Sequence, residues 1–473
     1  MELLTNLIVI IGVILLFNVM IFVHELGHFL AARWRGLVVD KFYIWFGKPI
    51  WKKTIKGVEY GLGSIPAGGF VALPQMAPME AIEGGDKERR RAMPEISPLD
   101  KIIVAFAGPL FSFLLAFAAS VGVWILGKPN DTLPTTTIGY VEEQSPAAEA
   151  GLEVGDRILA VDGHEVTAFF GGMEGITERI MLSEEEQITF RVEREGEEMT
   201  IVSDYDIPET AWWQRRAMRK VGISFEMDLI VDSVMEGSPA EKAGLQSGDQ
   251  LVSVNGVPLL NNMTLSDELK KNVGESVPVE IRRDGETFTV PVLSVVPRDK
   301  NTGQPVANGQ PMIGIGFQSI QSEDRLIKPG PNPVVQIKES VRLMIVTVQK
   351  IAAKLSPVGI QHLSGPIGIG RAMFDFLKSD YALNYILWFM VILNINLGIM
   401  NLLPFPVLDG GHIVLATGEW IARRPVQFKV LESIQTVAVV LLLFLFVFIA
   451  SKDIGDLIPS GEMTRTEDLY WEF

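Results

Sequence analysis

The chain has 473 residues, 48% of them hydrophobic, and a formal net charge of −16. It contains no cysteine, which excludes disulfides and thiolate metal ligands, and no basic stripe or motif that would indicate nucleic-acid binding. Apolar residues are concentrated in a few blocks, whereas residues 127–330 are polar. This distribution predicts a membrane protein with a large extramembrane insert.

Four apolar blocks are long enough for membrane helices, which need about 20 residues. They cover about residues 3–30, 102–126, 385–408 and 430–450. Basic residues gather in the 34–100 loop and again in the 410–428 loop. The positive-inside rule therefore places both loops in the cytoplasm, and the termini and the insert on the outer side.

The first block ends in His24-Glu25-Leu26-Gly27-His28, which fits the pattern H-E-x-x-H. Positions i and i+4 share one face of a helix, so His24 and His28 can chelate one metal ion. Glu25 would then lie near the open coordination position, where it could deprotonate water. Ionisable groups at membrane depth are costly and usually functional. The alternative is a cluster of interfacial polar residues that ends the helix.

The third metal ligand is less clear from the residues alone. A catalytic zinc usually takes three protein ligands, and the remaining histidines are His164, His362 and His412. His412 and Asp409 stand together after the third block. Spacing leaves both open as the third ligand, and an Asp before Gly-Gly also commonly ends a helix or forms a turn.

The insert contains an internal repeat. The sequence SPAAEAGLEVGDRILAVDG (145–163) recurs as SPAEKAGLQSGDQLVSVNG (238–256), which indicates two copies of one module. Each copy predicts a short helix, a Gly-Asp turn and an alternating strand. The modules resemble PDZ domains of bacterial proteases. That resemblance implies peptide binding by strand addition, while two β-rich spacers without a ligand are the alternative.

In each module the strand that would accept a peptide comes last, so the arrangement looks circularly permuted. The expected groove residues are Gly222 and Ile223 in the first module, and Gly314 and Ile315 in the second. Beyond the insert, residues 329–357 have an apolar stripe interrupted by charges. This pattern favours an amphipathic helix on the membrane surface, with a packed helix as the alternative.

Three motifs together resemble the site-2 protease family of intramembrane zinc metalloproteases, and the paired PDZ-like modules between the second and third blocks resemble its proteobacterial branch. The three motifs are HELGH, AGPLFSF (107–113) and NLLPFPVLDGG (401–411), one in each of the first three blocks. The resemblance implies one Zn²⁺ per chain held by His24, His28 and Asp409, with Glu25 as the catalytic base. It makes His412 a neighbour of the metal and not a ligand.

The same resemblance implies substrate-binding residues. Asn401 would hydrogen-bond the substrate backbone, and Asn396 would line the same cleft or make an interhelical hydrogen bond. Pro404 and Pro406 would break the span just before Asp409.

Residues 59–74 alternate and contain Gly68, Gly69 and Phe70. They resemble the family's membrane-re-entrant β-hairpin, whose edge pairs with an unwound substrate, although a plain cytoplasmic hairpin would read alike. Ser112 departs from the family's usual GPxxN motif, which puts the role of that position in doubt.

The expected fold is therefore a polytopic α-helical membrane protein with about four transmembrane helices, two inserted circularly permuted PDZ-like α+β domains and a membrane-associated β-hairpin. The expected segments are 1–33, 101–127, 381–409 and 429–473 for the spans, 34–100 and 410–428 for the loops, 128–229 and 230–322 for the PDZ-like domains, and 323–380 for the membrane-surface segment.

The expected function is cleavage of the transmembrane segment of single-span proteins, such as a pre-trimmed anti-sigma factor or signal-peptide remnants, in the bacterial inner membrane. The expected partners are this substrate, the lipid bilayer and peptide ligands of the PDZ-like domains. A non-proteolytic scaffold and an ion transporter are the competing functions. A transporter would be expected to show inverted repeats among its spans, and the repeat found lies in the polar insert.

Overall fold

The computed structural model describes residues 2–76, 96–300, 302–306, 309–318, 326–353, 356–423, 428–458 and 469–471. The basic residues Lys87, Arg89, Arg90, Arg91 and Arg424, on which the orientation prediction partly depends, lie outside these ranges. The chain divides into two compact units. The first comprises Met1–Pro129, Leu326–Gln349 and Leu363–Asp453, and the second comprises Asn130–Arg325, Lys350–His362 and Ile454–Phe473.

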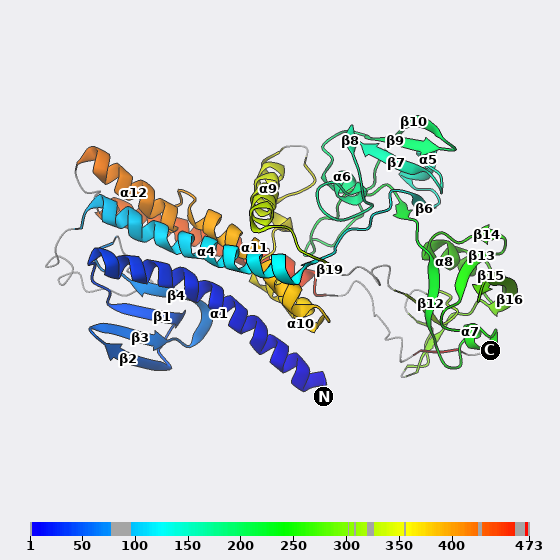
Figure 1. Cartoon of the computed structure of the whole chain (residues 1–473), viewed down its shortest axis with the longest axis horizontal. Coiled ribbons are helices and arrows are strands. Elements are labelled where there is room, and N and C mark those ends of the chain that lie inside the picture. The colour runs from blue at the N-terminus through cyan, green and yellow to red at the C-terminus, as the bar shows by residue number, and fades with distance from the viewer. Residues whose placement is uncertain are drawn as a thin grey trace. The chain divides into compact units, whose positions relative to one another are not determined.

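Within the described residues, four helices are long and apolar enough to cross a membrane, as the sequence predicts. They are α1 (Glu2–Arg35), α4 (Pro98–Leu126), α11 (Ala382–Asn401) and α13 (Phe428–Gly455). Helix α4 packs against α1 and α11, and the three lie side by side in Figure 1. Ala116, Val123 and Ile395 are among the buried residues that form their shared core.

The third apolar block does not continue as one helix to residue 409. Helix α11 ends at Asn401, and after a break that contains Pro404 and Pro406 a new helix, α12 (Asp409–Ala422), begins. The expected 410–428 loop is therefore helical over most of its length. Proline cannot donate the helical hydrogen bond, which accounts for the break. A Cβ at Gly410 would lie 2.2 Å from the Leu402 carbonyl oxygen, so α12 starts against the broken turn only because that side chain is missing.

Beside α1 lies a four-stranded sheet in the order β2-β3-β1-β4. Its strands are β1 (Lys41–Phe46), β2 (Trp51–Ile55), β3 (Val58–Leu62) and β4 (Ile65–Ala72). Residues 59–74 do not form the expected hairpin, because β1 lies between β3 and β4 and pairs with both. No described strand pairs with the outer edge of β4.

The insert leaves and rejoins the first unit at one place, where β5 (Lys128–Pro129) pairs with β19 (Leu326–Ile327). Three helical segments follow: α9 (Pro333–Ala352), the 3₁₀ turn η2 (Ile360–His362) and α10 (Pro366–Lys378). The start of α9 packs on α4, where Gln336 Nε2 donates to the Ser120 carbonyl at 3.0 Å. Leu343, Ile345 and Val348 on α9 stay exposed. The helix therefore combines a packed face with an apolar exposed one.

The two repeat copies fold into the same succession of elements, except that the second has one additional short strand, β17, before its last strand. The first module contains β6 (Ile138–Val141), α5 (Pro146–Ala150), β7 (Arg157–Val161), β8 (His164–Glu165), α6 (Ile176–Leu182), β9 (Ile188–Arg194), β10 (Glu197–Ser203) and β11 (Ile223–Phe225). The second contains β12 (Leu229–Val234), α7 (Pro239–Lys242), β13 (Gln250–Val254), β14 (Val257–Pro258), α8 (Asn262–Lys271), β15 (Ser276–Arg283), β16 (Glu286–Leu293), β17 (Arg298–Asp299) and β18 (Ile315–Phe317).

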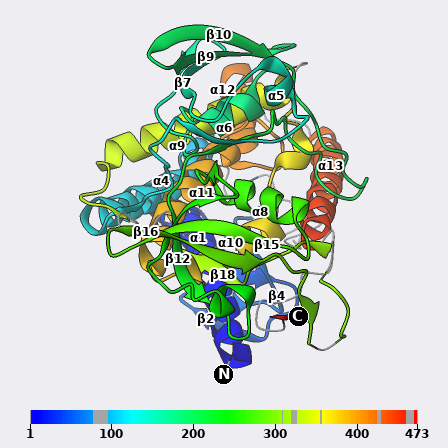
Figure 2. The same ribbon diagram turned by 90° about the vertical axis from the view of Figure 1, so that its right-hand side faces the viewer.

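In both modules the last strand pairs antiparallel with the first, β11 with β6 and β18 with β12. Figure 2 shows α8 beside the sheet that β12, β15, β16 and β18 help to form. The Gly-Asp turn of each repeat carries a buried aspartate that an arginine on the facing strand hydrogen-bonds, Asp156 with Arg194 and Asp249 with Arg283. The last short strand, β20 (Leu469–Tyr470), pairs with β17.

Candidate metal centre

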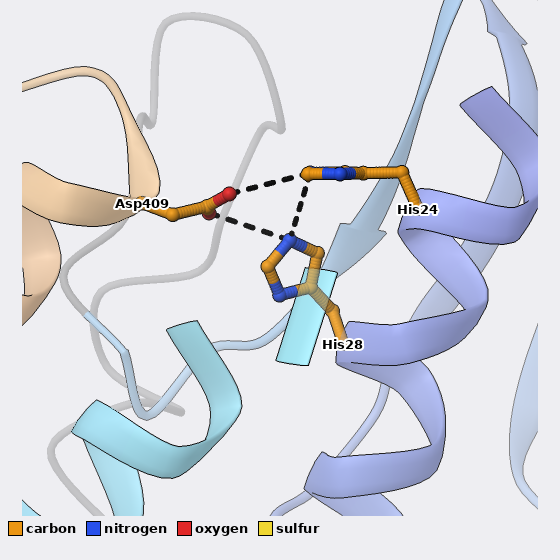
Figure 3. A group of neighbouring side chains, drawn as sticks. All are labelled: His24, His28 and Asp409. Atoms are coloured by element: carbon orange, nitrogen blue, oxygen red, sulfur yellow. Dashed lines mark hydrogen bonds and ion pairs between the residues drawn. The ribbon is translucent and has the colours of Figure 1, made fainter. Parts of the chain in front are cut away.

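Three side chains from two distant parts of the chain converge inside the first unit. His24 and His28 project from successive turns of α1, and Asp409 reaches toward both rings from the first residue of α12 (Figure 3). The Asp409 carboxylate oxygens lie 3.2 Å from His24 Nε2 and 3.3 Å from His28 Nε2. The two Nε2 atoms are 3.3 Å apart. Both histidines are buried, 7% and 9% exposed.

This donor set fits a zinc ion. Two ligand atoms bonded at about 2.0–2.2 Å to a tetrahedral zinc lie about 3.3–3.6 Å from each other. The two Nε2 atoms, 3.3 Å apart, have that spacing, and each lies within 3.3 Å of one oxygen of the Asp409 carboxylate, His24 facing Oδ2 and His28 facing Oδ1. Among the described residues, His24, His28 and Asp409 form the group of metal-binding side chain types whose ligand atoms all lie within 4.8 Å of one another. His412 lies near them but is not part of the group.

The remaining ring nitrogens are held by α4. His24 Nδ1 lies 3.0 Å from Ser112 Oγ, and His28 Nδ1 lies 2.8 Å from the Val104 carbonyl oxygen. With Nε2 turned toward a metal, each Nδ1 carries the proton and donates it to its oxygen partner, which fixes the tautomer and the ring orientation. Ser112, the departure from the family motif, is fully buried and contacts a candidate ligand directly.

Glycines allow α1 and α4 to approach at this point. A Cβ at Gly108 would lie 2.1 Å from His28 Nε2 and 2.8 Å from His24 Nε2. A Cβ at Gly27 would lie 2.3 Å from the Ala107 carbonyl oxygen. Gly108 of the second motif and Gly27 of HELGH therefore have the same role: both allow the close packing that brings α4 against the imidazoles.

A cavity of about 350 Å³ opens beside the three side chains. Glu25 lines it, one residue along α1 from His24. The β4 residues Gly68, Gly69 and Phe70, which the sequence predicts to bind substrate, line it too. A Cβ at Gly69 would lie 3.5 Å from Glu25 Cγ, so β4 passes directly over the candidate base. The cavity is thus lined by a candidate metal site, a carboxylate and a strand whose outer edge pairs with no other described strand.

Aromatic residues of β1 support this part of β4. The Phe46 and Phe70 rings stack with centroids 5.9 Å apart, and the Tyr43 ring packs on Phe70 at 5.3 Å. The Tyr43 hydroxyl donates to Glu59 at 2.6 Å. Burial, together with this hydrogen bond, raises the pKa of Tyr43 to about 12. Tyr43 therefore stays a neutral donor at any physiological pH.

The remaining predicted substrate residues differ in position. Asn401 lines the cavity, and its Nδ2 lies 3.4 Å from His24 Nε2. Asn396 is not among the lining residues, and its buried Oδ1 finds no hydrogen-bond partner in the described part of the chain. Pro404 and Pro406 lie in the break between α11 and α12 and shape the site only through the backbone.

In the first module Gly222 and Ile223 line a groove of about 330 Å³, together with Thr177 and Ile180 of α6. In the second module Gly314 and Ile315 occupy the equivalent positions. A Cβ at Gly222 would lie 2.3 Å from Ser145 Cβ, and one at Gly314 would lie 2.3 Å from Ser238 Cβ. The predicted groove residues therefore have matching surroundings in the two repeats.

Several lining residues carry no sequence signal of their own. Ile21, Phe46, Val71, Leu397 and Val407 are apolar residues among many, and only the fold brings them to the cavity. His412 also lines it. Ser112, in contrast, does carry a sequence signal, because it stands where the family motif usually has asparagine.

The apolar helices and the three side chains at metal-ligand spacing point to a class of protein, a membrane protein with a candidate metal site next to a carboxylate. Comparison with known proteins gives the family. The model of peptidase family M50 matches residues 12–445. The chain belongs to this family, the site-2 proteases, and is a peptidase.

Named relatives match along nearly their whole length. A regulator of sigma E protease from Haemophilus influenzae is 31% identical over 455 residues, which are 92% of this chain and 96% of the relative. A protease RseP from Yersinia pestis is 30% identical over 439 residues, 90% and 94% of the two chains. A Pasteurella multocida protein whose name describes a zinc metalloprotease is 29% identical over 463 residues, 93% and 97%.

Among solved structures, the PDZ domain of an SdrC-like protein from Listeria monocytogenes resembles part of this chain. It covers 20% of this chain and 93% of its own length, at 22% identity and a TM-score of 0.16. A likeness this limited carries no argument about the modules.

Proposed function

We propose that this peptidase is an intramembrane zinc endopeptidase that cuts the transmembrane segment of single-span proteins. One observation carries the proposal. His24, His28 and Asp409 lie at zinc-ligand spacing beside the Glu25 carboxylate, among helices apolar enough to cross a membrane. Ionisable groups at such depth are costly and are kept for function. A scaffold protein would have no need for the metal-ligand spacing.

Residues of the chain would divide the chemistry among them. A zinc ion held by His24, His28 and Asp409 would supply a Lewis acid for water and for the scissile carbonyl. Glu25 would accept the proton of the attacking water and deliver it to the leaving amine. Asn401, at the cavity edge, would hydrogen-bond the substrate backbone and hold the scissile bond in place.

The outer edge of β4, with which no strand pairs in the part of the chain that the structure describes, supports a role in substrate binding. A peptide bond within a helix is shielded by its own hydrogen bonds, so the substrate has to unwind before attack. An unwound strand in lipid needs partners for its N–H and C=O groups. The edge of β4 at Gly68, Gly69 and Phe70 offers them by strand addition. This role requires that the β1–β4 sheet reach membrane depth, as the resemblance implies.

The insert would act as a filter on the outer side of a bacterial inner membrane. In this arrangement both termini and the two modules face the periplasm, and residues 34–100 and 410–428 face the cytoplasm. The modules, as circularly permuted PDZ-like domains, would exclude bulky substrates and bind peptide at Gly222-Ile223 and Gly314-Ile315. The substrates would be single-span proteins already trimmed outside, such as an anti-sigma factor, and signal-peptide remnants.

The catalytic proposal is tested with Glu25→Gln, which keeps the size of the side chain and removes the base. The purified wild type and variant are incubated with a model single-span substrate, and zinc is measured in both. We expect equal zinc and loss of cleavage by at least 10²-fold, the usual contribution of a general base. Glu339→Gln, an exposed carboxylate on α9, serves as the control. Cleavage by Glu25→Gln at the wild-type rate would refute the assignment.

The filter proposal is tested separately by deleting residues 130–320. We expect the shortened chain to cleave single-span substrates that still carry a folded outer domain, which the full chain should leave intact. Mass spectrometry of the products gives the position of the cut in each case. Unchanged selectivity after the deletion would show that the modules do not select substrates.

A further inference from the structure

The chain that follows α13 binds the second module. Leu469 and Trp471 are 5% and 8% exposed, and they form a buried cluster with Val306, against which Met235, Val295 and Val296 pack. The backbone contributes to this contact as well. Strand β20 pairs antiparallel with β17, and Tyr470 lies opposite Arg298. The indole also lies over Gly314, since a Cβ there would be 3.0 Å from Trp471 Cζ2.

The contact lies beside β18, the strand of the module that is expected to accept a peptide. The segment that leads from β16 into β18 carries Val295, Val306 and Gly314, and β18 is the strand expected to accept a peptide. A side chain at Gly314 would collide with both Ser238 and Trp471. The apolar site is thus continuous with the start of the peptide-accepting strand.

The equivalent segment of the first module also contacts residues at the end of α13, through an ion pair and a close backbone approach. Between β10 and β11 it carries Trp213 and Arg215, and Arg215 pairs with Asp456, just past the end of α13. A Cβ at Gly455 would lie 2.2 Å from the Trp213 carbonyl oxygen. Both repeats therefore contact the residues after α13 through the segment that enters their last strand. The recurrence of such a contact in both repeats indicates that it is a specific feature of the fold.

We propose that Leu469–Trp471 is an intramolecular ligand of the second module, bound in a site made for an apolar and aromatic peptide. Together with the Arg215–Asp456 pair, it ties both modules to the residues that follow α13. Ten residues separate Ile458 from Leu469, so the tie limits the distance between these two residues to about 40 Å. An outside peptide that joins β18 meets a module whose neighbouring apolar site is already filled.

Cysteine cross-linking tests the contact, because the chain has no cysteine of its own. Arg298 and Tyr470 are direct partners across an antiparallel pair. Such partners have Cα atoms about 4.5–5.5 Å apart, within the range of disulfides. We expect Arg298→Cys/Tyr470→Cys in the full-length protein to cross-link as completely as the strand partners Arg282→Cys/Thr287→Cys. Thr287→Cys/Tyr470→Cys should cross-link at least fivefold less.

Trp471→Ala tests whether the indole is the anchor. In the Arg298→Cys/Tyr470→Cys background we expect it to lower the cross-linked fraction at least fivefold. In the otherwise unchanged chain it should speed amide hydrogen exchange of residues 312–317 about tenfold. Trp212→Ala, which removes a Trp that is 84% exposed, should change neither. Cross-linking no better than that of the Thr287 pair, or unaffected by Trp471→Ala, would overturn the proposal. Neither measurement depends on peptidase activity.

Discussion

Replacing Ser112 by alanine tests how α4 organises the metal site. The hydroxyl lies 3.0 Å from His24 Nδ1, and both residues are buried. Removing it leaves the proton of His24 Nδ1 without its partner in a place that excludes water. The ring is then free to change tautomer or to rotate, and both changes weaken its Nε2 as a ligand.

The size of the effect follows from two sources. A buried donor left without a partner costs about 1–3 kcal/mol. Loss of a hydrogen-bond partner of a metal-binding histidine typically lowers metal affinity about 10–100-fold, which corresponds to about 1.4–2.8 kcal/mol. The two free energies agree, so we expect Ser112→Ala to bind zinc about 10–100-fold more weakly than the wild type.

The assay is zinc release from the purified full-length protein to a chelator of known affinity. Ser120→Ala is a matched control, because Ser120 is also a fully buried serine of α4 but donates to the Phe117 carbonyl of its own helix. Ser112→Thr keeps a hydroxyl and should retain zinc better than Ser112→Ala. If Ser112→Ala and Ser120→Ala release zinc alike, the hydrogen bond does not hold His24 and the reasoning fails.

Two further predictions concern packing and charge. Gly108→Ala places a methyl group 2.1 Å from His28 Nε2, so we expect it to abolish zinc binding, whereas Gly122→Ala, which meets only the flexible Leu387 side chain at 3.1 Å, should keep zinc as measured by mass spectrometry. Arg283→Ala removes the guanidinium 2.7 Å from buried Asp249. Burial alone would raise the pKa of Asp249, but the hydrogen bonds from Arg283 and the Gln246 N–H outweigh it and the pKa is lowered. The stability that the pair contributes is therefore complete above about pH 4, the ordinary value, and is lost as pH falls through the lowered one. We expect the variant to lose about 2–3 kcal/mol at pH 7, less than a fully buried pair because Arg283 is 26% exposed. Amide exchange of β13 measures this loss, and a difference from wild type that grows as pH falls below 4 would contradict it.

The parts of the fold that obey local rules could be predicted from the sequence. The four apolar blocks follow from hydropathy, and the pairing of His24 with His28 follows from the helical repeat. The turns of the two modules are local as well, since Asp162 and Asn255 adopt positive φ before their glycines. In each case the residues that determine the feature lie within a few positions of one another.

The parts that depend on distant residues could not. Spacing left both Asp409 and His412 open as the third metal ligand, and only the resemblance to a family favoured Asp409. The structure places the Asp409 carboxylate within 3.3 Å of both histidine Nε2 atoms. The insertion of β1 between β3 and β4 is a non-local pairing that alternation in residues 59–74 cannot reveal. The same holds for β20, whose partner strand lies about 170 residues earlier in the chain.

The central claim is that His24, His28 and Asp409 hold one zinc ion for peptide-bond hydrolysis. The direct measurement is zinc per chain, together with cleavage of a single-span substrate, in the wild type, Asp409→Ala and His412→Ala. We expect one zinc per chain in the wild type and His412→Ala, and neither zinc nor cleavage in Asp409→Ala. Full zinc in Asp409→Ala, with zinc lost from His412→Ala, would contradict it.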